Sequence, residues 1–392
     1  MLVKKKSAST TSGAFNSFGA FRTWIEISRS AAEHNYRIFR ALINPETKLW
    51  AVVKSNAYGH GLLVFSKLID KIGIDGFCVD SLLEGLKLRK EGIKKSILVL
   101  GPTLQNISDL AKKENITITV SSFDALRAIG QMKSPPNFHL KIDTGMHRQG
   151  FFMKDIPRII RFLNDKRFAL HDSLNGIYTH FASAKDTNYP TYTDLQFNQF
   201  SKAVKIFETA GFKNLIKHVS ATGGVMIDPK YHLNAVRVGI GLYGLWPAKE
   251  LEIQLGSQIN LEPILNWKTI ISEIKNISSG QFVGYDLVER VLRPSKIAVL
   301  PIGYWHGLSR ALSGVGEILI NGRRAKILGR VSMDLVVVDV TGIKCGVGDS
   351  AILIGKDRNQ KITAFELGQK SNTSHYEFVT RLNPLMERII IS

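Results

Sequence analysis

Short apolar runs alternate with amphipathic stretches over the first two thirds of the chain, a pattern that predicts strands alternating with helices. The strands are predicted at residues 50–54, 76–79, 96–100, 116–120, 138–143, 175–181, 217–220 and 236–243. The helices between them include residues 82–90, 122–131, 156–163 and 194–210. Eight such units predict a closed (β/α)8 TIM-like barrel, with an open doubly wound sheet as the alternative. No Gly-rich dinucleotide turn follows the first strand, which favours the barrel.

Beyond about residue 258 the alternation stops, and strand-like runs follow one another with one helix near residues 364–370. Asn321-Gly322 separates two of these runs and is a strong hairpin signal. We therefore predict a tail at residues 1–22, a barrel at 23–258 and a mostly antiparallel β domain at 259–392. A short strand at residues 24–27 belongs either to the barrel or to the β domain.

Composition excludes several protein classes. The hydrophobic fraction of 44% and the charged fraction of 22% are typical of a globular chain, and no apolar run approaches the roughly 18 residues that a membrane span needs. The net charge of +19 is spread along the chain without a nucleic-acid module, so no nucleic-acid partner is predicted. Two cysteines, Cys78 and Cys345, favour a reducing, cytoplasmic location. The first 25 residues are basic but lack the apolar core of a secretion signal, and a disordered tail is preferred over a transit peptide.

Lys54 stands at the end of the first barrel strand, directly before a turn rich in Ser, Asn and Gly. An ammonium in such a place can extend to water, pair with an anion, or have its pKa lowered and act as a nucleophile. The third possibility suggests Schiff-base chemistry with a carbonyl substrate or with pyridoxal phosphate. In a barrel, the carboxyl ends of all strands meet at one face, and the other predicted strands bring to it Lys141, Asp143, His180, His218, Ser220 and Arg237.

Two segments rich in glycine lie near the carboxyl ends of the last two predicted strands, where barrels commonly bind phosphate. They are Thr222 to Gly224 and Gly239 to Gly241. Taken singly, each of these signals has a more ordinary explanation, because strand-end lysines usually reach solvent and glycines usually mark turns.

Six ordered segments together resemble the alanine racemase family. AVVKSNAYGHG at residues 51–61 resembles its pyridoxal-lysine motif. The other five are LKIDTGMHRQG (140–150), THFA (179–182), VRVGIGLYGL (236–245), PIGY (301–304) and GRVSMD (329–334). Six blocks in the family's order are far more specific than any one motif. The resemblance covers roughly residues 22–392 and implies a pyridoxal 5'-phosphate-dependent isomerase of fold type III that supplies D-alanine for peptidoglycan.

The resemblance also implies residue roles. Lys54 would bind the cofactor covalently and act as the base on one face of Cα, and Tyr285 would serve the opposite face. Racemisation needs both, because one group removes a proton and the other returns one from the other side. Arg237 would face the pyridine nitrogen, with His218 behind it and His180 linking it to the tyrosine. Further matching positions are Tyr58, Thr222, Gly239 and Ile240 for the phosphate, and Arg148 and Met333 for the carboxylate of a small amino-acid substrate; no metal is implied.

Lys141 sits where many family members carry a carbamylated lysine that orients the arginine matched here by Arg148. The alternative is an unmodified lysine paired with Asp143. In the family, the residues matched by Tyr285 and Met333 reach the site from the partner subunit, so a head-to-tail homodimer is expected. Pro384, Trp305-His306 and Asp286 depart from the family's common residues. Alternatives are a broader amino-acid racemase, a decarboxylase of the same fold, and a pyridoxal-binding carrier.

Overall fold

The computed structural model describes residues 21–104, 107–168, 170–186 and 190–392. The predicted tail lies almost wholly outside this described part. Contacts divide the chain into two compact units. The barrel unit comprises Ile25–Asn266, Ile362–Pro384 and Arg388–Ser392. Of the described residues, the β unit comprises 21–24, Trp267–Lys361 and Leu385–Glu387.

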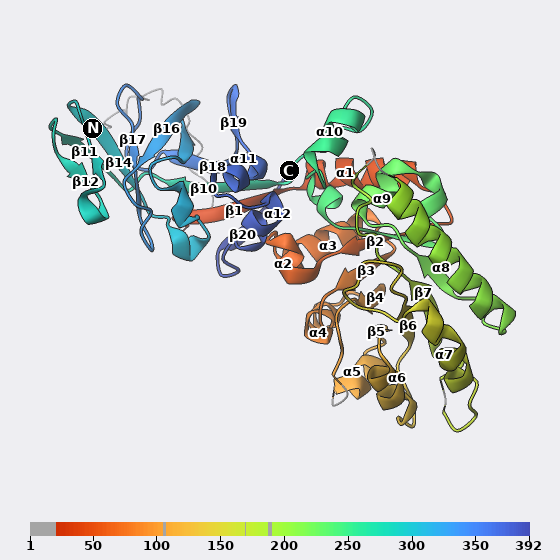
Figure 1. The fold of residues 1–392 in the computed structure, drawn as a ribbon. Helices are drawn as coiled ribbons and strands as arrows, with labels where there is room; N and C mark the ends of the chain where they lie inside the picture. The colour runs from red at the N-terminus through yellow and green to blue at the C-terminus, as the bar shows by residue number, and fades with distance from the viewer. Residues whose placement is uncertain (1–20, 105–106, 169, 187–189) are drawn as a thin grey trace, which may run out of the picture. The chain divides into compact units, whose positions relative to one another are not determined.

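Eight parallel strands form the wall of the barrel unit in its described part (Figure 1). They make two four-stranded sheets, in the orders β4-β3-β2-β9 and β5-β6-β7-β8. Hydrogen bonds from Val99 N to Thr117 O and from Arg237 N to Ser220 O join the sheets on their two sides and so close the barrel. The strands are β2 (Lys48–Val52), β3 (Gly76–Val79), β4 (Ser96–Val99), β5 (Ile118–Val120), β6 (Phe138–Lys141), β7 (Leu174–Tyr178), β8 (Ile216–His218) and β9 (Ala235–Val238).

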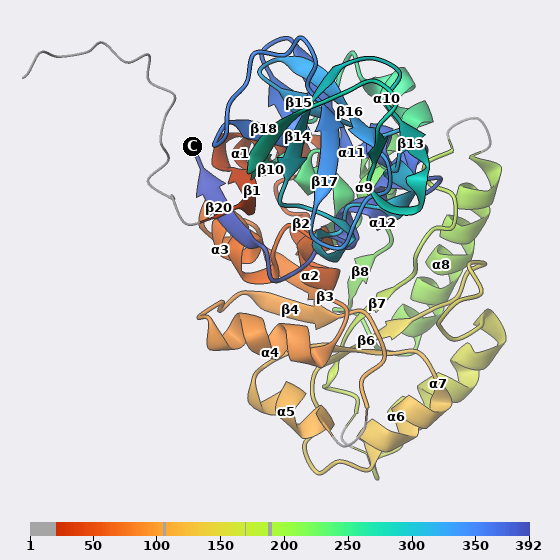
Figure 2. The ribbon, with the colours of Figure 1, turned by 90° about the vertical axis from the view of Figure 1, so that its left-hand side faces the viewer.

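Helices cover the outside of these strands, as Figure 2 shows for α4 to α8. Local sequence explains their limits. The Ser81 and Ser122 hydroxyls cap α4 and α6 by accepting backbone N–H groups, and α7 buries Ile156, Ile159 and Leu163 at helical spacing. The helices of this unit are α1 (Arg29–Leu42), α2 (Lys54–Tyr58), α3 (Leu62–Ile72), α4 (Leu82–Lys90), α5 (Ser108–Lys113), α6 (Phe123–Gly130), α7 (Ile156–Leu163), α8 (Thr191–Thr209), α9 (Thr222–Ile227), α10 (Lys249–Leu255), α11 (Ala364–Lys370) and α12 (His375–Thr380).

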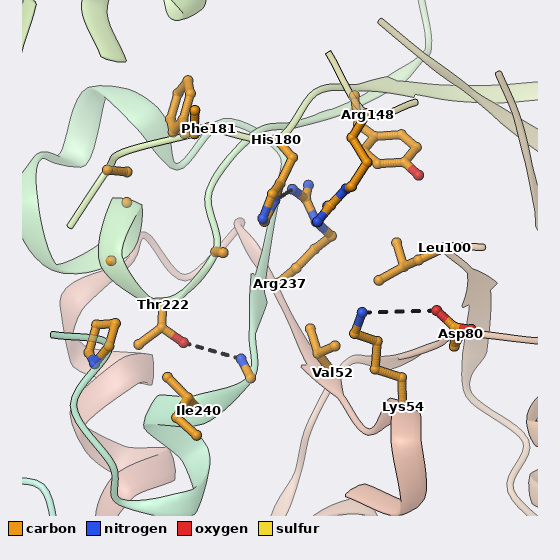
Figure 3. A pocket seen from close by; sticks show the side chains of 18 of the residues that line it. Val52, Lys54, Asp80, Leu100, Arg148, His180, Phe181, Thr222, Arg237 and Ile240 are labelled. Carbon is orange, nitrogen blue, oxygen red and sulfur yellow. Dashed lines mark hydrogen bonds and ion pairs between the residues drawn. The ribbon is translucent and has the colours of Figure 1, made fainter. Parts of the chain in front are cut away.

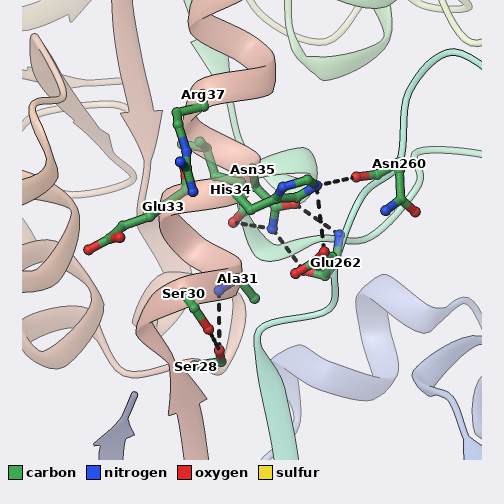
Figure 4. A network of polar contacts seen from close by, with 10 residues as sticks. Ser28, Ser30, Ala31, Glu33, His34, Asn35, Arg37, Asn260 and Glu262 are labelled. Carbon is green, nitrogen blue, oxygen red and sulfur yellow. Dashed lines mark hydrogen bonds and ion pairs between the residues drawn. The ribbon is translucent and has the colours of Figure 1, made fainter.

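A buried asparagine ties α1 to the segment that leaves the barrel (Figure 4). The Asn35 amide donates to the carbonyl of Glu262 at 2.8 Å, and its oxygen accepts from the N–H of Glu262 at 2.9 Å. His34 lies 2.8 Å from the carbonyl of Asn260 through Nε2. One side chain thus replaces a strand partner for a loop whose backbone would otherwise be unpaired.

The β unit contains an antiparallel sheet in the order β11-β14-β17-β16-β15-β18-β10. The Asn321-Gly322 hairpin joins β15 and β16, as the sequence predicted. The strands that lie wholly in the β unit are β11 (Glu273–Ile277), β12 (Phe282–Val283), β13 (Glu289–Arg290), β14 (Ser295–Leu300), β15 (Glu317–Ile320), β16 (Arg323–Leu328), β17 (Val336–Asp339) and β18 (Ser350–Asp357). The division between the units falls within four further strands: β1 (Thr23–Ser28), β10 (Leu265–Ile270), β19 (Gln360–Ile362) and β20 (Glu387–Ile391).

The predicted fold class, a barrel with a mostly antiparallel β domain, is confirmed, but several elements differ from the sequence prediction. Strand β2 ends at Val52, so Lys54 begins a helical turn instead of closing the strand. Residues 240–243 form a 3₁₀ turn, because Gly239 leaves the extended conformation. Residues 362–384 group by contacts with the barrel unit. The boundaries at 22 and 258 remain predictions. No helix in the described ranges is long and apolar enough to span a bilayer.

Candidate active site

A cavity of about 690 Å³ opens at the carboxyl ends of the barrel strands (Figure 3). Its volume is that of an ordinary small-molecule site. Nine of the predicted site residues line it: Lys54, Tyr58, Lys141, Arg148, His180, Thr222, Arg237, Gly239 and Ile240. His218 is buried directly behind Arg237. Tyr285 and Met333 belong to the β unit, where 65% and 53% of their surfaces are exposed.

Lys54 enters the cavity from the first turn after β2, with Nζ 3.9 Å from Oδ1 of Asp80 (Figure 3). The four residues that follow it, Ser55 to Tyr58, all have left-handed backbones with φ between 52° and 56°. Non-glycine residues rarely adopt this conformation, which costs about 1 kcal/mol or more for each residue. The surrounding structure must therefore hold the turn that presents the lysine.

Arg237 is buried among neutral acceptors. Only 2% of its surface is exposed, and its guanidinium donates to Nδ1 of His218 at 2.5 Å and to the carbonyls of Thr179 and Val219, each at 2.9 Å. His180 Nδ1 lies 3.3 Å away. Burial lowers the pKa of Arg237, and burial together with this cation holds the pKa of both histidines well below 6.5. Within the described ranges no carboxylate pairs with Arg237, so the cavity contains a buried cation suited to a hydrogen-bond acceptor or an anion.

A second part of the cavity is lined by hydroxyl groups and by glycine backbone that no side chain covers. The Thr222 hydroxyl accepts from the N–H groups of Gly239 at 3.2 Å and Gly241 at 3.3 Å, which fixes the loop after β9 (Figure 3). A Cβ on Gly239 would lie 2.8 Å from the Tyr58 hydroxyl, so only glycine leaves that phenol room. Burial raises the pKa of Tyr58 to about 12 and keeps it a donor at neutral pH.

Lys141 ends β6 and is buried close to Arg148. Burial first, and then the charge of Arg148, lowers the pKa of Lys141 from 10.5 to about 8. Its ammonium donates to Oε1 of Gln149 at 3.2 Å. The Asp143 carboxylate instead accepts from the backbone N–H groups of Gly145 and His147. In the described part of the chain, Lys141 therefore forms no ion pair with Asp143.

The charges that line the cavity are unbalanced. Five cations face one carboxylate, that of Asp80; the cations are Lys54, Lys141, Arg148, Lys185 and Arg237. A concave site that is lined mainly by positive charges favours anionic ligands. The described residues contain no cluster of three or more His, Cys, Asp or Glu side chains that could hold a metal ion.

Comparisons with known proteins agree along the whole chain. Residues 27–247 match the family model of the alanine racemase N-terminal domain, and residues 264–390 match that of the C-terminal domain. The chain belongs to the alanine racemase family. An alanine racemase from Leptospira interrogans is 34% identical over 388 residues, with 97% of this chain and 98% of that one covered. Another, from Methanococcus maripaludis, is 36% identical over 373 residues, covering 94% and 98%.

Solved structures give the same result. An alanine racemase from Bacillus anthracis with bound L-Ala-P is similar with a TM-score of 0.87 and 30% identity, covering 95% of each chain. One from Clostridium difficile 630 has a TM-score of 0.88 and 31% identity, covering 95% of this chain and 96% of that one. The resemblance seen in the sequence is thus confirmed, and the chain is an isomerase of the alanine racemase family.

The cavity of this member of the alanine racemase family also contains residues that the sequence analysis did not single out. Tyr376 reaches it from α12, with its ring centroid 6.2 Å from that of Tyr58. Tyr178 ends β7, and its ring lies under both Arg237, at 5.2 Å, and Lys141, at 5.5 Å. Tyr178 was not recognised because the predicted strand continued to residue 181, three residues beyond the observed end of β7. No periodicity or spacing connects Tyr376 to the barrel.

Proposed function

We propose that this chain interconverts L-alanine and D-alanine with pyridoxal 5'-phosphate bound in the barrel cavity. The observation that carries the proposal is Arg237, a buried cation with neutral protein partners, in one cavity with a lysine on a constrained turn. The donor set fits the cofactor. Tyr58, Thr222 and the backbone of Gly239 and Ile240 supply the small, uncrowded surface that a phosphate needs, and Arg237 can donate to the pyridine nitrogen.

When bound, the cofactor withdraws electrons from the substrate Cα–H bond and makes its proton acidic. Lys54 holds the cofactor and moves the proton on one face of Cα. Tyr285 moves it on the other face, while Arg148 and Met333 hold the substrate carboxylate. Because Arg237 is a permanent donor, it disfavours protonation of the ring nitrogen, and side reactions that need a stronger electron sink are suppressed.

The proposed site is shared between the subunits of a homodimer, with Tyr285 and Met333 supplied by the partner. Large apolar side chains that are exposed in the β unit, most of them within residues 282–292, support this, since an interface would bury them. They include Phe282, Leu287, Val288, Leu292 and Leu335. Mixing Lys54→Ala protein with Tyr285→Phe protein should form dimers with one intact site and recover activity. Mixed dimers without recovered activity would contradict the shared site.

Lys141 is proposed to carry a carbamate. Its neutral amine would attack CO2, forming the N–C bond and releasing a proton, and a pKa near 8 makes that amine available. Nε2 of Gln149 is buried without a hydrogen-bond partner in the described structure, and a carbamate oxygen would supply one. The new anion would also orient Arg148. A ¹³C signal from labelled bicarbonate should appear in the wild type and be missing in Lys141→Met; an unmodified lysine in a high-resolution map contradicts this assignment.

The activity is tested with purified protein. We expect visible absorbance from the lysine-bound cofactor, and loss of optical rotation from L-Ala faster than from L-Ser or L-Lys. In Tyr285→Phe, racemisation should stop while the α-hydrogen of one enantiomer still exchanges with D2O, because one base remains. Tyr36→Phe is the control, since the Tyr36 hydroxyl on α1 donates to the carbonyl of Gly73 and Tyr36 does not line the cavity. Absence of cofactor absorbance contradicts the cofactor, and equal rates on all three amino acids contradict alanine selectivity.

The cytoplasmic location predicted from the sequence belongs to the same proposal. Both cysteines are free, Cys78 buried and Cys345 partly exposed, which supports a reducing compartment.

A further inference from the structure

A third histidine extends the contacts of Arg237 into the barrel interior. Nε2 of His218 lies 2.8 Å from Nδ1 of His139, and both rings are buried. His139 comes from β6, His218 from β8 and Arg237 from β9, so the three residues cross the barrel between strands that are separate in sequence.

The hydrogen bonds fix where each proton resides. Arg237 can only donate, so Nδ1 of His218 must be unprotonated and accept. A neutral His218 then carries its proton on Nε2 and donates it to Nδ1 of His139. Both rings remain neutral, in accord with a pKa of about 3 for His139, which burial and then the charge of Arg237 cause. His139 is thus the acceptor that selects the tautomer of His218.

The barrel makes room for this ring. Gly176 lies opposite His139 in the β6–β7 pairing, and a Cβ on Gly176 would come within 2.6–2.7 Å of three atoms of the imidazole. Glycine inside a strand weakens it and often marks close approach of another group. The Trp50 ring packs against both histidines, with its centroid 5.9 Å from that of His139 and 5.1 Å from that of His218. The close packing leaves the His139 ring little freedom to turn.

We propose that His139 is a positioning residue for the cofactor site: through His218 it orients Arg237 toward the pyridine nitrogen of pyridoxal phosphate. The inference rests on the proposed function for the identity of that ligand. Without His139, the Nε2–H of His218 is buried with no acceptor. His218 escapes this cost by moving its proton to Nδ1, which places two donors against each other and displaces Arg237.

The test compares His139→Phe, His139→Gln and Gly176→Ala in the full-length protein loaded with pyridoxal phosphate. Three quantities are measured: the dissociation constant of the cofactor, the ¹⁵N resonance of its labelled pyridine nitrogen, and kcat and KM separately. His139→Phe should weaken cofactor binding by about tenfold, the effect of one unsatisfied buried donor. The ¹⁵N resonance should shift, and kcat should fall more than KM rises. His139→Gln should restore most of each value, because its amide oxygen can accept from His218.

His232→Phe is the matched control, since His232 is also buried and the one side-chain hydrogen bond of its ring in the described structure is with the carbonyl of Val225. It should lose stability without moving the ¹⁵N resonance. If His139→Phe leaves the resonance and the dissociation constant within about twofold of wild type, the role is structural and the inference is overturned; that margin is small beside the expected effect. If His139→Phe does not fold, Gly176→Ala decides the question. A dissociation constant and a ¹⁵N resonance equal to those of the wild type in Gly176→Ala overturn the inference. If the wild type binds no pyridoxal phosphate, the proposed function fails, and a crystal structure of His139→Gln or Gly176→Ala still shows whether the Arg237–His218 contact depends on His139.

Discussion

Oε1 of Glu84 accepts a hydrogen bond of 2.8 Å from the N–H of Ser55, the first left-handed residue after Lys54. Its other oxygen, Oε2, accepts at 2.8 Å from the N–H of Asp80, the acid beside Lys54. One carboxylate of helix α4 therefore holds both backbone segments from which the lysine and its neighbouring acid extend.

Removal of this carboxylate should disturb the lysine. We expect Glu84→Ala to lower the free energy of unfolding by about 1–2 kcal/mol, because two charge-assisted hydrogen bonds are lost from a partly exposed site. A misplaced Lys54 should also reduce kcat by about tenfold. Glu84→Gln keeps one acceptor, so its free energy of unfolding and its kcat should lie between those of Glu84→Ala and the wild type. Urea unfolding and initial rates measure both effects, with Glu250→Gln, an exposed carboxylate on α10, as the control. A wild-type kcat in Glu84→Ala contradicts the positioning role.

The pKa of Lys141 predicts a pH dependence of stability. It is lowered from 10.5 to about 8 in the folded protein, so between these values the unfolded chain binds more protons. The free energy of unfolding should therefore rise with pH from about 8 to 10.5, by at most about 1.4 kcal/mol per pH unit. Lys141→Met removes this contribution, and the difference between variant and wild type should shrink as pH rises. Unfolding in CO2-free buffer measures it, and parallel pH profiles of the two proteins contradict the assignment.

Asn35 should contribute strongly to stability. Asn35→Ala leaves the N–H and the carbonyl of Glu262 without their partner, and we expect a loss of about 1–3 kcal/mol. Arg37→Ala, at an exposed position two residues further along α1, should change the free energy of unfolding by no more than about 0.5 kcal/mol. Equal losses in the two variants, read from urea unfolding curves, would show that the loop does not depend on this amide.

Gly59 fixes where α12 packs. It has φ of +84°, and a Cβ there would lie 1.9 Å from the carbonyl of Val379 in the helix that carries Tyr376. Gly92 has a similar φ of +92° with nothing within 4 Å of its added Cβ. Gly92→Ala should cost about 1–2 kcal/mol from the backbone alone. Gly59→Ala should lower the free energy of unfolding by more than Gly92→Ala does. It should also weaken cofactor binding, which a titration with pyridoxal phosphate measures. Equal effects of both substitutions would show that contact with α12 is unimportant.

Local patterns predicted part of this structure well. The limits of α4 and α7 match the prediction, because the Ser81 cap of α4 and the hydrophobic spacing of α7 each act within a few residues. The turn after Lys54 was not predictable in the same way. Ser, Ala and Tyr have no preference for left-handed backbone, and it is Glu84 of another helix that bonds to the start of the turn.

By itself, the sequence determined the alternation of strands and helices, the family, and the set of reactive residues at the strand ends, because each is written in local spacing or in contiguous motifs. Only the tertiary structure decided which of these groups meet and in what state. In this structure Tyr376 lies beside Tyr58, and Lys141 donates to Gln149 and forms no ion pair with Asp143. His139 and His218, from different strands, are within hydrogen-bond distance of each other. These contacts depend on strand register and on the space left by Gly176, and the physical reason is that burial and pairing between distant segments set protonation and orientation, which no local pattern encodes.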